Sequence, residues 1–269
     1  MITDTHAHIY SHQFDNDRKN VLQQAFAVGV DKILMPNIDS QSIEGMMQLV
    51  EQYPEKCFPM MGLHPCSIDA HFEKELQTIE SWLNKYPFVA VGEMGLDLYW
   101  DKTYFEQQKE AFRIQAEWAK KHGLPLVVHC REAMAETLSL LESLSDENLF
   151  GVLHCFTGTV EEAKRLYAIN FRVGIGGVVT YQKGDLASTV AQIPVEQIVL
   201  ETDSPYLAPV PYRGKRNQPA YLTLIAQKVA EAKQVPLSDL AEQTTKNALR
   251  LFFERQAAIM PTTAYTASS

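Results

Sequence analysis

The chain opens with Ile2-Thr3-Asp4-Thr5-His6-Ala7-His8, an apolar start followed by two histidines one residue apart. We expect a short strand over residues 2–6. Residues i and i+2 of a strand point to the same side, with their Cα atoms about 6.5 Å apart. Two imidazoles placed in this way can bind one metal ion. A single His-x-His is weak evidence for a metal site, because strand histidines are often only hydrogen-bonded. Whether this pair binds a metal therefore depends on further candidate ligands elsewhere in the chain.

Short apolar stretches alternate with amphipathic stretches along the whole chain. The apolar stretches predict eight strands, at residues 2–6, 32–36, 57–62, 88–93, 125–129, 151–154, 171–176 and 198–203. The amphipathic ones predict helices at residues 15–28, 42–52, 72–85, 103–122, 132–144, 160–169, 186–192, 219–233 and 237–253. Eight such alternations indicate parallel strands with right-handed crossovers. Apolar runs with little alternation are typical of a sheet that is buried on both faces.

This pattern favours an α/β fold, a single-domain (β/α)8 TIM barrel over residues 1–253. Such barrels commonly need about 250 residues. An open doubly wound sheet fits less well, because no Gly-rich dinucleotide loop follows the first strand and no second domain is visible. The chain ends in small and polar residues, so we expect residues 254–269 to form a flexible C-terminal tail.

Composition limits the classes of function. Of 269 residues, 46% are hydrophobic and 21% are charged, as in ordinary soluble proteins. No apolar run approaches the roughly 20 residues that cross a bilayer, and the N-terminus lacks a signal-peptide pattern. Four cysteines without CxxC spacing suggest reduced thiols in a cytoplasmic protein. The net charge of −9 argues against non-specific binding of nucleic acid over the whole surface, but it allows a local basic groove. No obligatory protein partner is evident.

Side chains that can bind metals follow six of the predicted strands. The carboxyl ends of barrel strands converge at one mouth, where active sites lie. Each histidine alone would more often be an ordinary hydrogen-bonded residue, but seven such residues at one level favour a metal site. They are His6 and His8 after the first strand, His64 after the third, Glu93 at the fourth, His129 at the fifth, His154 at the sixth and Asp203 at the eighth.

The number of these residues suits two ions, because four imidazoles and two carboxylates are more ligands than the four of one tetrahedral site. A carboxylate can bridge two ions about 3.5–4 Å apart, which together contact the attacking and leaving oxygens of a phosphate displacement. Asp203 could also hold the attacking water and take its proton. Mixed N/O ligands suit Zn, Mn or Fe, whereas Mg accepts carboxylates and waters, so the residue types leave the ion open. We expect one site from His6, His8 and Asp203 and the other from His129 and His154, with Glu93 as the bridge.

Other polar residues near the mouth are candidates for substrate contacts. His64 is not needed to complete either metal site, and we favour a role for it in contacting a substrate phosphate. A spare metal ligand and a loop-stabilising histidine are the alternatives. Arg131 could bind a phosphate through its planar guanidinium or pair with an acidic neighbour. The segment 211–217 could contact a phosphate backbone or be a solvated loop. Its cations are Arg213, Lys215 and Arg216.

Two cysteines, Cys130 and Cys155, each follow a candidate ligand histidine. A Cys–His nucleophile pair is one interpretation. Neighbouring residues of a strand point to opposite faces, so thiols beside inward-facing histidines should face the helix layer. We therefore expect two core cysteines.

Six blocks of the chain together resemble the TatD-type metal-dependent deoxyribonucleases, a branch of the amidohydrolase-like TIM barrels. The resemblance runs from about residue 1 to residue 253, with all the blocks in order. The blocks are Asp4-Thr5-His6-Ala7-His8, Gly62-Leu63-His64-Pro65, Gly92-Glu93-Met94-Gly95-Leu96-Asp97, Pro125-Leu126-Val127-Val128-His129-Cys130-Arg131, His154-Cys155-Phe156-Thr157-Gly158 and Leu200-Glu201-Thr202-Asp203-Ser204-Pro205.

The resemblance implies a (β/α)8 barrel whose metal ligands are the same six residues. It also implies metal-dependent hydrolysis of phosphodiesters, often as a 3′-to-5′ exonuclease on DNA that is supported by Mg2+. Two positions depart from the family pattern. Tyr10 stands where Asp or Asn is usual, and Leu98 where Tyr is common. Neither is a ligand, so we expect them to affect only substrate fit. Glu93 stands where many amidohydrolase relatives carry a carboxylated lysine.

We therefore expect a metal-dependent hydrolase, most specifically a deoxyribonuclease that cleaves DNA phosphodiester bonds at 3′ ends, with single-stranded DNA as substrate. Catalysis would use Asp203, Glu93 and a water activated by two divalent metal ions, Mg2+ or alternatively Zn2+ or Mn2+. A small-molecule amidohydrolase or lactonase on the same binuclear site is the alternative. A metal-binding scaffold without catalysis is a third class, against which the complete ligand set argues.

Overall fold

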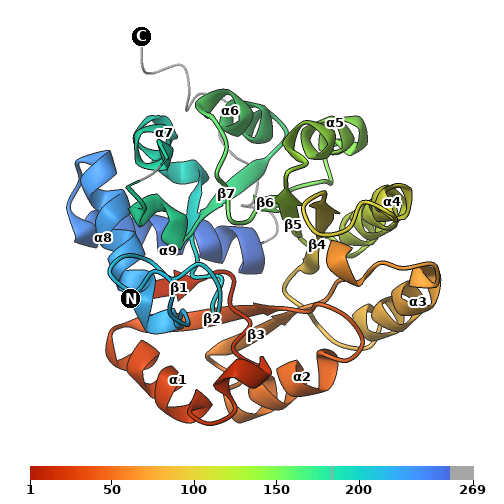
Figure 1. Ribbon diagram of the computed structural model, residues 1–269, viewed down its shortest axis with the longest axis horizontal. Coiled ribbons are helices and arrows are strands. Elements are labelled where there is room, and N and C mark those ends of the chain that lie inside the picture. Colours follow the sequence, from red (N-terminus) through yellow and green to blue (C-terminus); the bar gives the residue numbers. More distant parts are fainter. Residues whose placement is uncertain (183, 255–269) are drawn as a thin grey trace.

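The computed structural model describes residues 1–182 and 184–254, in which helices and strands alternate (Figure 1). Most of the predicted tail, residues 255–269, lies outside the described residues. The strands are β1 (Ile2–Asp4), β2 (Val30–Pro36), β3 (Cys57–Met60), β4 (Val91–Asp97), β5 (Leu126–Arg131), β6 (Gly151–Leu153), β7 (Phe171–Ile175) and β8 (Ile198–Leu200). The helices are α1 (Arg18–Ala27), α2 (Ile43–Gln52), α3 (Phe72–Leu83), α4 (Phe105–His122), α5 (Met134–Leu144), α6 (Val160–Ala168), α7 (Leu186–Gln192), α8 (Leu222–Lys233) and α9 (Leu237–Phe253).

The parallel strands form a closed barrel. Strand pairing runs in chain order through β1-β2-β3 and through β4-β5-β6-β7-β8. Parallel bridges join these two sheets between Met61 and Val91 and between Ala7 and Ser204. At the second junction the His8 N–H donates to the Ser204 carbonyl at 2.7 Å. Helices surround the strands (Figure 1). The predicted (β/α)8 barrel is therefore confirmed.

The interior of the barrel has an apolar layer beneath a polar one. A buried cluster separate from the main core combines strand residues with the inner face of α9, so α9 closes the end opposite to the strands' carboxyl ends. Because strand residues two apart share a face, His129 lies on the same side as Val127, and His154 on the same side as Val152. The cluster consists of Leu34, Met60, Ala90, Val127, Phe150, Val152, Val199, Ala248, Leu251 and Phe252.

Strand β4 departs most from the prediction, since it spans Val91–Asp97 instead of residues 88–93. Its pairing with β5 is irregular between Val91 and Met94. At Gly95 φ is +155°, and a Cβ there would come within 1.9 Å of the His129 carbonyl oxygen. The strand can therefore continue past Glu93 only because glycine allows the two backbones to approach. β8, in contrast, ends at Leu200 and not at residue 203.

No helix among the described residues is long and apolar enough to cross a membrane.

Candidate metal centre

Glu93 lies at the centre of the polar layer and is 2% exposed. Its Oε2 is 3.0 Å from Nε2 of His6 and 3.4 Å from Nε2 of His8. Its Oε1 is 2.9 Å from Nδ1 of His129 and 2.8 Å from Nε2 of His154. Each carboxylate oxygen therefore faces different histidines, as a bridging carboxylate requires, and Nε2 of His64 also lies 3.4 Å from Oε1.

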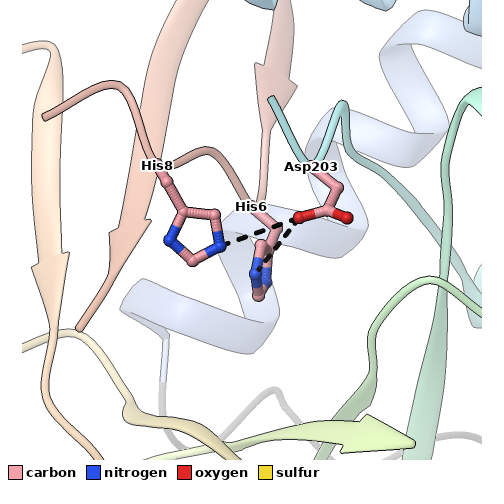
Figure 2. A group of neighbouring side chains, drawn as sticks. All are labelled: His6, His8 and Asp203. Atoms are coloured by element: carbon pink, nitrogen blue, oxygen red, sulfur yellow. Dashed lines mark ion pairs between the residues drawn. The ribbon is translucent and has the colours of Figure 1, made fainter. Parts of the chain in front are cut away.

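His6, His8 and Asp203 form the first ligand set (Figure 2). Asp203 has φ of +56°, and its Oδ1 lies 3.7 Å from Nε2 of His8 and 3.9 Å from Nε2 of His6. Ligand atoms around a tetrahedral ion with bonds of about 2.1 Å lie about 3.4 Å apart. The spacing therefore fits one ion shared by these three side chains.

His129 and His154 form the second ligand set. Nδ1 of His129 lies 3.3 Å from Nε2 of His154, and both nitrogens are within 2.9 Å of Oε1 of Glu93. The 3.3 Å between the two nitrogens is close to the spacing around one ion, whereas the contacts to Glu93 have the length of charge-assisted hydrogen bonds. The structure thus brings all six predicted ligands together, while their roles as ligands stay a prediction.

The outer nitrogen of His8 has a partner that fixes its tautomer. Nδ1 of His8 lies 3.0 Å from the Tyr10 hydroxyl, which donates its own proton to the Pro36 carbonyl at 2.6 Å. The hydroxyl must then accept the His8 Nδ1–H, so Nε2 of His8 directs a lone pair to the cluster. Tyr10 therefore orients a candidate ligand, a role that goes beyond the substrate fit expected from the sequence.

In both histidines of the second ligand set, the ring nitrogen that faces away from Glu93 lies near another carboxylate. Nε2 of His129 lies 2.9 Å from Oδ2 of Asp97, so a ring with a single proton would carry it on Nε2 and leave the lone pair of Nδ1 to an ion beside Glu93. Nδ1 of His154 lies 3.5 Å from Oε1 of Glu201, a charge contact that is too long for a good hydrogen bond. Both contacts favour a free lone pair on the nitrogen that faces the cluster.

His64 is the exception among the histidines at the mouth. Its Nδ1 accepts the Cys66 N–H at 3.0 Å, which leaves the ring proton on Nε2, 3.4 Å from Oε1 of Glu93. Burial lowers the pKa of His64 below 6.5, so the ring is neutral. Although its Nε2 lies within ligand distance of Glu93 and His129, His64 presents an N–H to the cluster and not a lone pair. The geometry therefore favours a substrate contact over a spare ligand, and the Cys66 bond also stabilises the loop.

The buried groups of this centre shift one another's pKa values strongly. Burial alone would raise the pKa of Glu93, but the imidazoles around it, His154 foremost, lower that pKa well below 4.5. Burial likewise opposes charge on His154, yet Glu93 raises its pKa well above 6.5. Burial and the neighbouring His154 lower the pKa of His6 to about 4, and burial raises the pKa of Asp203 to about 6. A cation at the centre would replace the protons that now balance Glu93.

Comparison with known proteins assigns the family. The family model described as "TatD related DNase" matches residues 3–253. The chain belongs to the TatD family. It is 37% identical to the uncharacterized metal-dependent hydrolase YabD of Bacillus subtilis, covering 94% of this chain and 99% of YabD. It is 32% identical to the 3'-5' ssDNA/RNA exonuclease TatD of Pectobacterium carotovorum, covering 93% and 98%.

A solved structure supports the same assignment. The crystal structure of YjjV, a TatD homolog from Escherichia coli, superimposes with a TM-score of 0.88 at 29% identity and covers 93% of this chain and 97% of that one. The protein is thus a metal-dependent hydrolase of the TatD family with a TIM-barrel fold. The family assignment agrees with a centre whose donor atoms have the spacing that metal ions require.

Asp97 and Glu201 belong to this TatD-family centre, although the sequence pattern assigns them no role. The predicted strand ends at Glu93, so Asp97 lies beyond it, whereas β4 extends to Asp97. The signal for Glu201 was its place two residues after the inward-facing Val199. Its side chain lies against Gly174, where a Cβ would come within 2.1 Å of the Glu201 Oε2. Both residues were part of the quoted blocks, and alternation along a longer strand could have placed them.

Two of the predicted substrate cations lie over tyrosine rings. The guanidinium carbon of Arg131 is 3.8 Å from the ring centroid of Tyr99, and that of Arg213 is 4.4 Å from the ring centroid of Tyr181. Both arginines and Lys215 are exposed. Arg131 and Arg213 are therefore positioned on aromatic faces, with the edges of their guanidinium groups available to a substrate.

Arg216 is held differently from the other cations of segment 211–217. Its guanidinium forms two hydrogen bonds with Asp17, at 2.6 and 2.9 Å, and a third with the Gln13 carbonyl at 2.6 Å. These bonds tie the segment to the start of α1. A role of Arg216 in substrate binding stays a prediction, and we leave it out of the proposed contact surface.

The two cysteines differ from each other. Cys130 faces α5, where Thr137 donates to its sulfur at 3.4 Å, as strand alternation predicts. Cys155 lies beyond the end of β6, with φ of +47°, so the alternation does not extend to it. Burial and then the charge of Asp203 raise the pKa of its thiol well above the usual range. The expected position of Cys155 in the helix layer therefore stays a prediction, and its neutral thiol is a poor nucleophile.

Proposed function

We propose that the protein is a deoxyribonuclease that removes nucleotides from the 3′ end of single-stranded DNA with two divalent ions. The observation that carries this proposal is Glu93, whose two oxygens face two ligand sets of suitable spacing. The Pectobacterium relative named as a 3'-5' ssDNA/RNA exonuclease, 32% identical, supports the choice of substrate.

Each ion would be bound by a different ligand set. One ion would be bound by His6, His8 and Asp203. The other would be bound by His129 and His154, and Glu93 would bind both ions. Two ions held there would polarise the scissile phosphate and make a water molecule more acidic. Asp203, a buried carboxylate beside His6 and His8, would accept the proton of the attacking water. We propose Mg2+ as the ion, with Mn2+ and Zn2+ as ions that four imidazoles also accept.

His64 would bind the substrate phosphate. Its Nε2–H points to the cluster beside Oε1 of Glu93, and its tautomer is fixed by the Cys66 N–H. A neutral donor at this place can contact a phosphate oxygen without displacing an ion. The substrate role therefore uses a neutral histidine whose proton is directed to the cluster by the Cys66 N–H.

The rim cations Arg131, Arg213 and Lys215 would bind the DNA backbone. In a barrel with pairing in chain order, β4 and β8 are four strands apart and lie on opposite sides. Arg131 lies over Tyr99, which follows β4, whereas Arg213 and Lys215 follow β8. Cations on opposite sides of the mouth suit a strand that passes across it, in a chain of net charge −9.

The test is cleavage of a single-stranded oligonucleotide labelled at its 5′ end. We expect products that shorten one nucleotide at a time, complete inhibition by EDTA and recovery with Mg2+ or Mn2+. Cleavage that resists chelation would contradict the proposal. Hydrolysis of lactones or amides without shortening of DNA would favour a small-molecule hydrolase on the same centre. We also propose a cytoplasmic location, because all four cysteines are free thiols.

A further inference from the structure

Two exposed aromatic side chains follow β4 directly. Trp100 is 68% exposed and Tyr99 is 47% exposed. Their ring centroids are 4.8 Å apart and the ring planes are at 87°. Single exposed aromatics are common on protein surfaces, so exposure alone implies nothing. What distinguishes this pair is how it is attached to the metal centre.

Asp97 fixes the aromatic pair to the candidate metal centre. Its Oδ1 accepts the backbone N–H groups of Tyr99, at 2.9 Å, and of Trp100, at 3.1 Å. Its Oδ2 contacts Nε2 of His129 at 2.9 Å. One buried carboxylate therefore sets the position of a candidate ligand and of the two rings together.

Arg131 joins the same group from the neighbouring strand. It lies two residues beyond His129, and its carbonyl accepts the N–H of Leu98 at 2.9 Å. Its guanidinium carbon lies 3.8 Å from the ring centroid of Tyr99 and 5.3 Å from that of Trp100. A candidate ligand, a cation and two aromatic rings are thus connected by backbone and side-chain contacts.

Trp100 borders a cavity between the loop after β3 and the loop after β4, which Cys66, Asp97 and Tyr104 also line. Most of the Trp100 side chain is nevertheless exposed, so a planar group could stack on it from the solvent.

We infer that Trp100 is a stacking surface for the nucleobase beside the scissile phosphate, with Arg131 contacting the phosphate backbone next to it. This inference rests on the proposed function and adds which part of the substrate is bound by which residues. Tyr99 supports the guanidinium of Arg131, and Asp97 keeps the surface at a fixed place relative to His129. Every base has an aromatic face, so this contact favours a single-stranded end without sequence preference.

The test uses two oligonucleotides of the same sequence, one normal and one with an abasic residue at its 3′ end. Binding of each 5′-labelled oligonucleotide is measured by fluorescence anisotropy with Ca2+ in place of Mg2+, and cleavage is measured with Mg2+. Trp100→Ala should weaken binding of the normal oligonucleotide roughly 5- to 150-fold, the loss expected for one stacked base. It should leave binding of the abasic oligonucleotide unchanged, and Trp100→Phe should restore most of the loss.

Four outcomes would overturn the inference. Equal binding of the normal oligonucleotide by wild type and Trp100→Ala would exclude stacking, and equal loss with both oligonucleotides would indicate a general structural effect. A wild-type protein that neither binds nor cleaves either oligonucleotide would contradict the proposed function and the inference together. Cleavage by wild type with no effect of Trp100→Ala would contradict the inference alone. Because the side chain of Trp100 is mostly exposed, both variants are expected to fold.

Discussion

Oδ2 of Asp97 lies 2.9 Å from Nε2 of His129, on the side of the imidazole that faces away from Glu93. In Asp97→Asn the single amide oxygen can still accept the N–H groups of Tyr99 and Trp100, which places the amide NH2, a donor without charge, beside Nε2 of His129. We expect the affinity of the second ligand set for Mn2+ to fall about 10- to 100-fold, as for other partners of ligand histidines. Isothermal titration calorimetry measures this. Asp101→Asn, in the exposed part of the same loop, is the control, and equal affinities in both variants would exclude this role of Asp97.

His64 and His129 should behave differently when each is replaced by alanine. His129→Ala removes a lone pair that faces Glu93, so metal content and activity should fall together. His64→Ala removes an N–H, so metal content should stay at the wild-type value while the cleavage rate falls roughly 100-fold, the loss typical of one donor to a transition state. Metal analysis and single-turnover cleavage check both. A lower metal content in His64→Ala would make His64 a ligand instead.

Removing Arg213 and Lys215 should weaken DNA binding and make it less sensitive to salt. Each phosphate contact of a single strand contributes about 0.7 to the slope of log K against log salt. The double variant Arg213→Ala/Lys215→Ala should therefore lower that slope by about 1 to 1.5. Lys121→Ala, an exposed lysine in the last turn of α4 at the other end of the barrel, is the control. An unchanged slope would place the DNA elsewhere.

The metal-free protein should lose stability as the pH rises above 6.5. Burial opposes charge on His154 and His129, yet Glu93 raises the pKa of His154, and Asp97 raises that of His129. A base with a raised folded-state pKa stabilises the fold fully below its unfolded-state value of 6.5 and loses this contribution as pH rises through the folded-state value. The pKa of Glu93 is lowered, so its contribution is complete above 4.5 and does not change in this range.

Thermal unfolding in a chelator, measured at several pH values above 6.5, checks whether Tm decreases as the pH rises. With saturating Mg2+ the decrease should be smaller, because ions replace the protons beside Glu93. A Tm that rises with pH in the chelator would contradict the assigned ionisations.

Chelation should lower thermal stability as well as activity. His6 and His8 follow β1 and Asp203 follows β8, so an ion bound by them joins the two strands that close the barrel. At a free ion concentration 100 times Kd, binding adds about 2.7 kcal/mol, or roughly 5–10 °C in Tm for a chain of this size. Differential scanning calorimetry with and without EDTA measures the shift. Identical values would show that the ions serve chemistry alone.

The barrel and the six-residue cluster followed from the sequence because both depend on position along strands. Eight apolar runs with helices between them leave few topologies, and His129 and His154 belong to the same inner face as Val127 and Val152. The strand boundaries were less accurate. β4 passes through Glu93 to Asp97 because Gly95 allows close contact with β5, and no local pattern shows such an approach.

The orientation of each imidazole could not be predicted at all. It depends on the outer partner of each ring, such as the Tyr10 hydroxyl for His8 and the Cys66 N–H for His64. These partners differ in whether they accept or donate, and that difference separates a candidate ligand from a candidate substrate contact. The partner of Arg216 could not be predicted either, because its bond to Asp17 joins segments that are far apart in the sequence.

The junction between the first and last strands also fixes an order of events during synthesis. Asp203 leaves the ribosome 197 residues after His6 (203 − 6). At 5–20 residues per second, this is a delay of about 10–40 s. The first ligand set therefore cannot exist while the chain is still short, although Glu93, His129 and His154 have all emerged earlier. In a cell, the ion of the first ligand set would be loaded only once the barrel is complete.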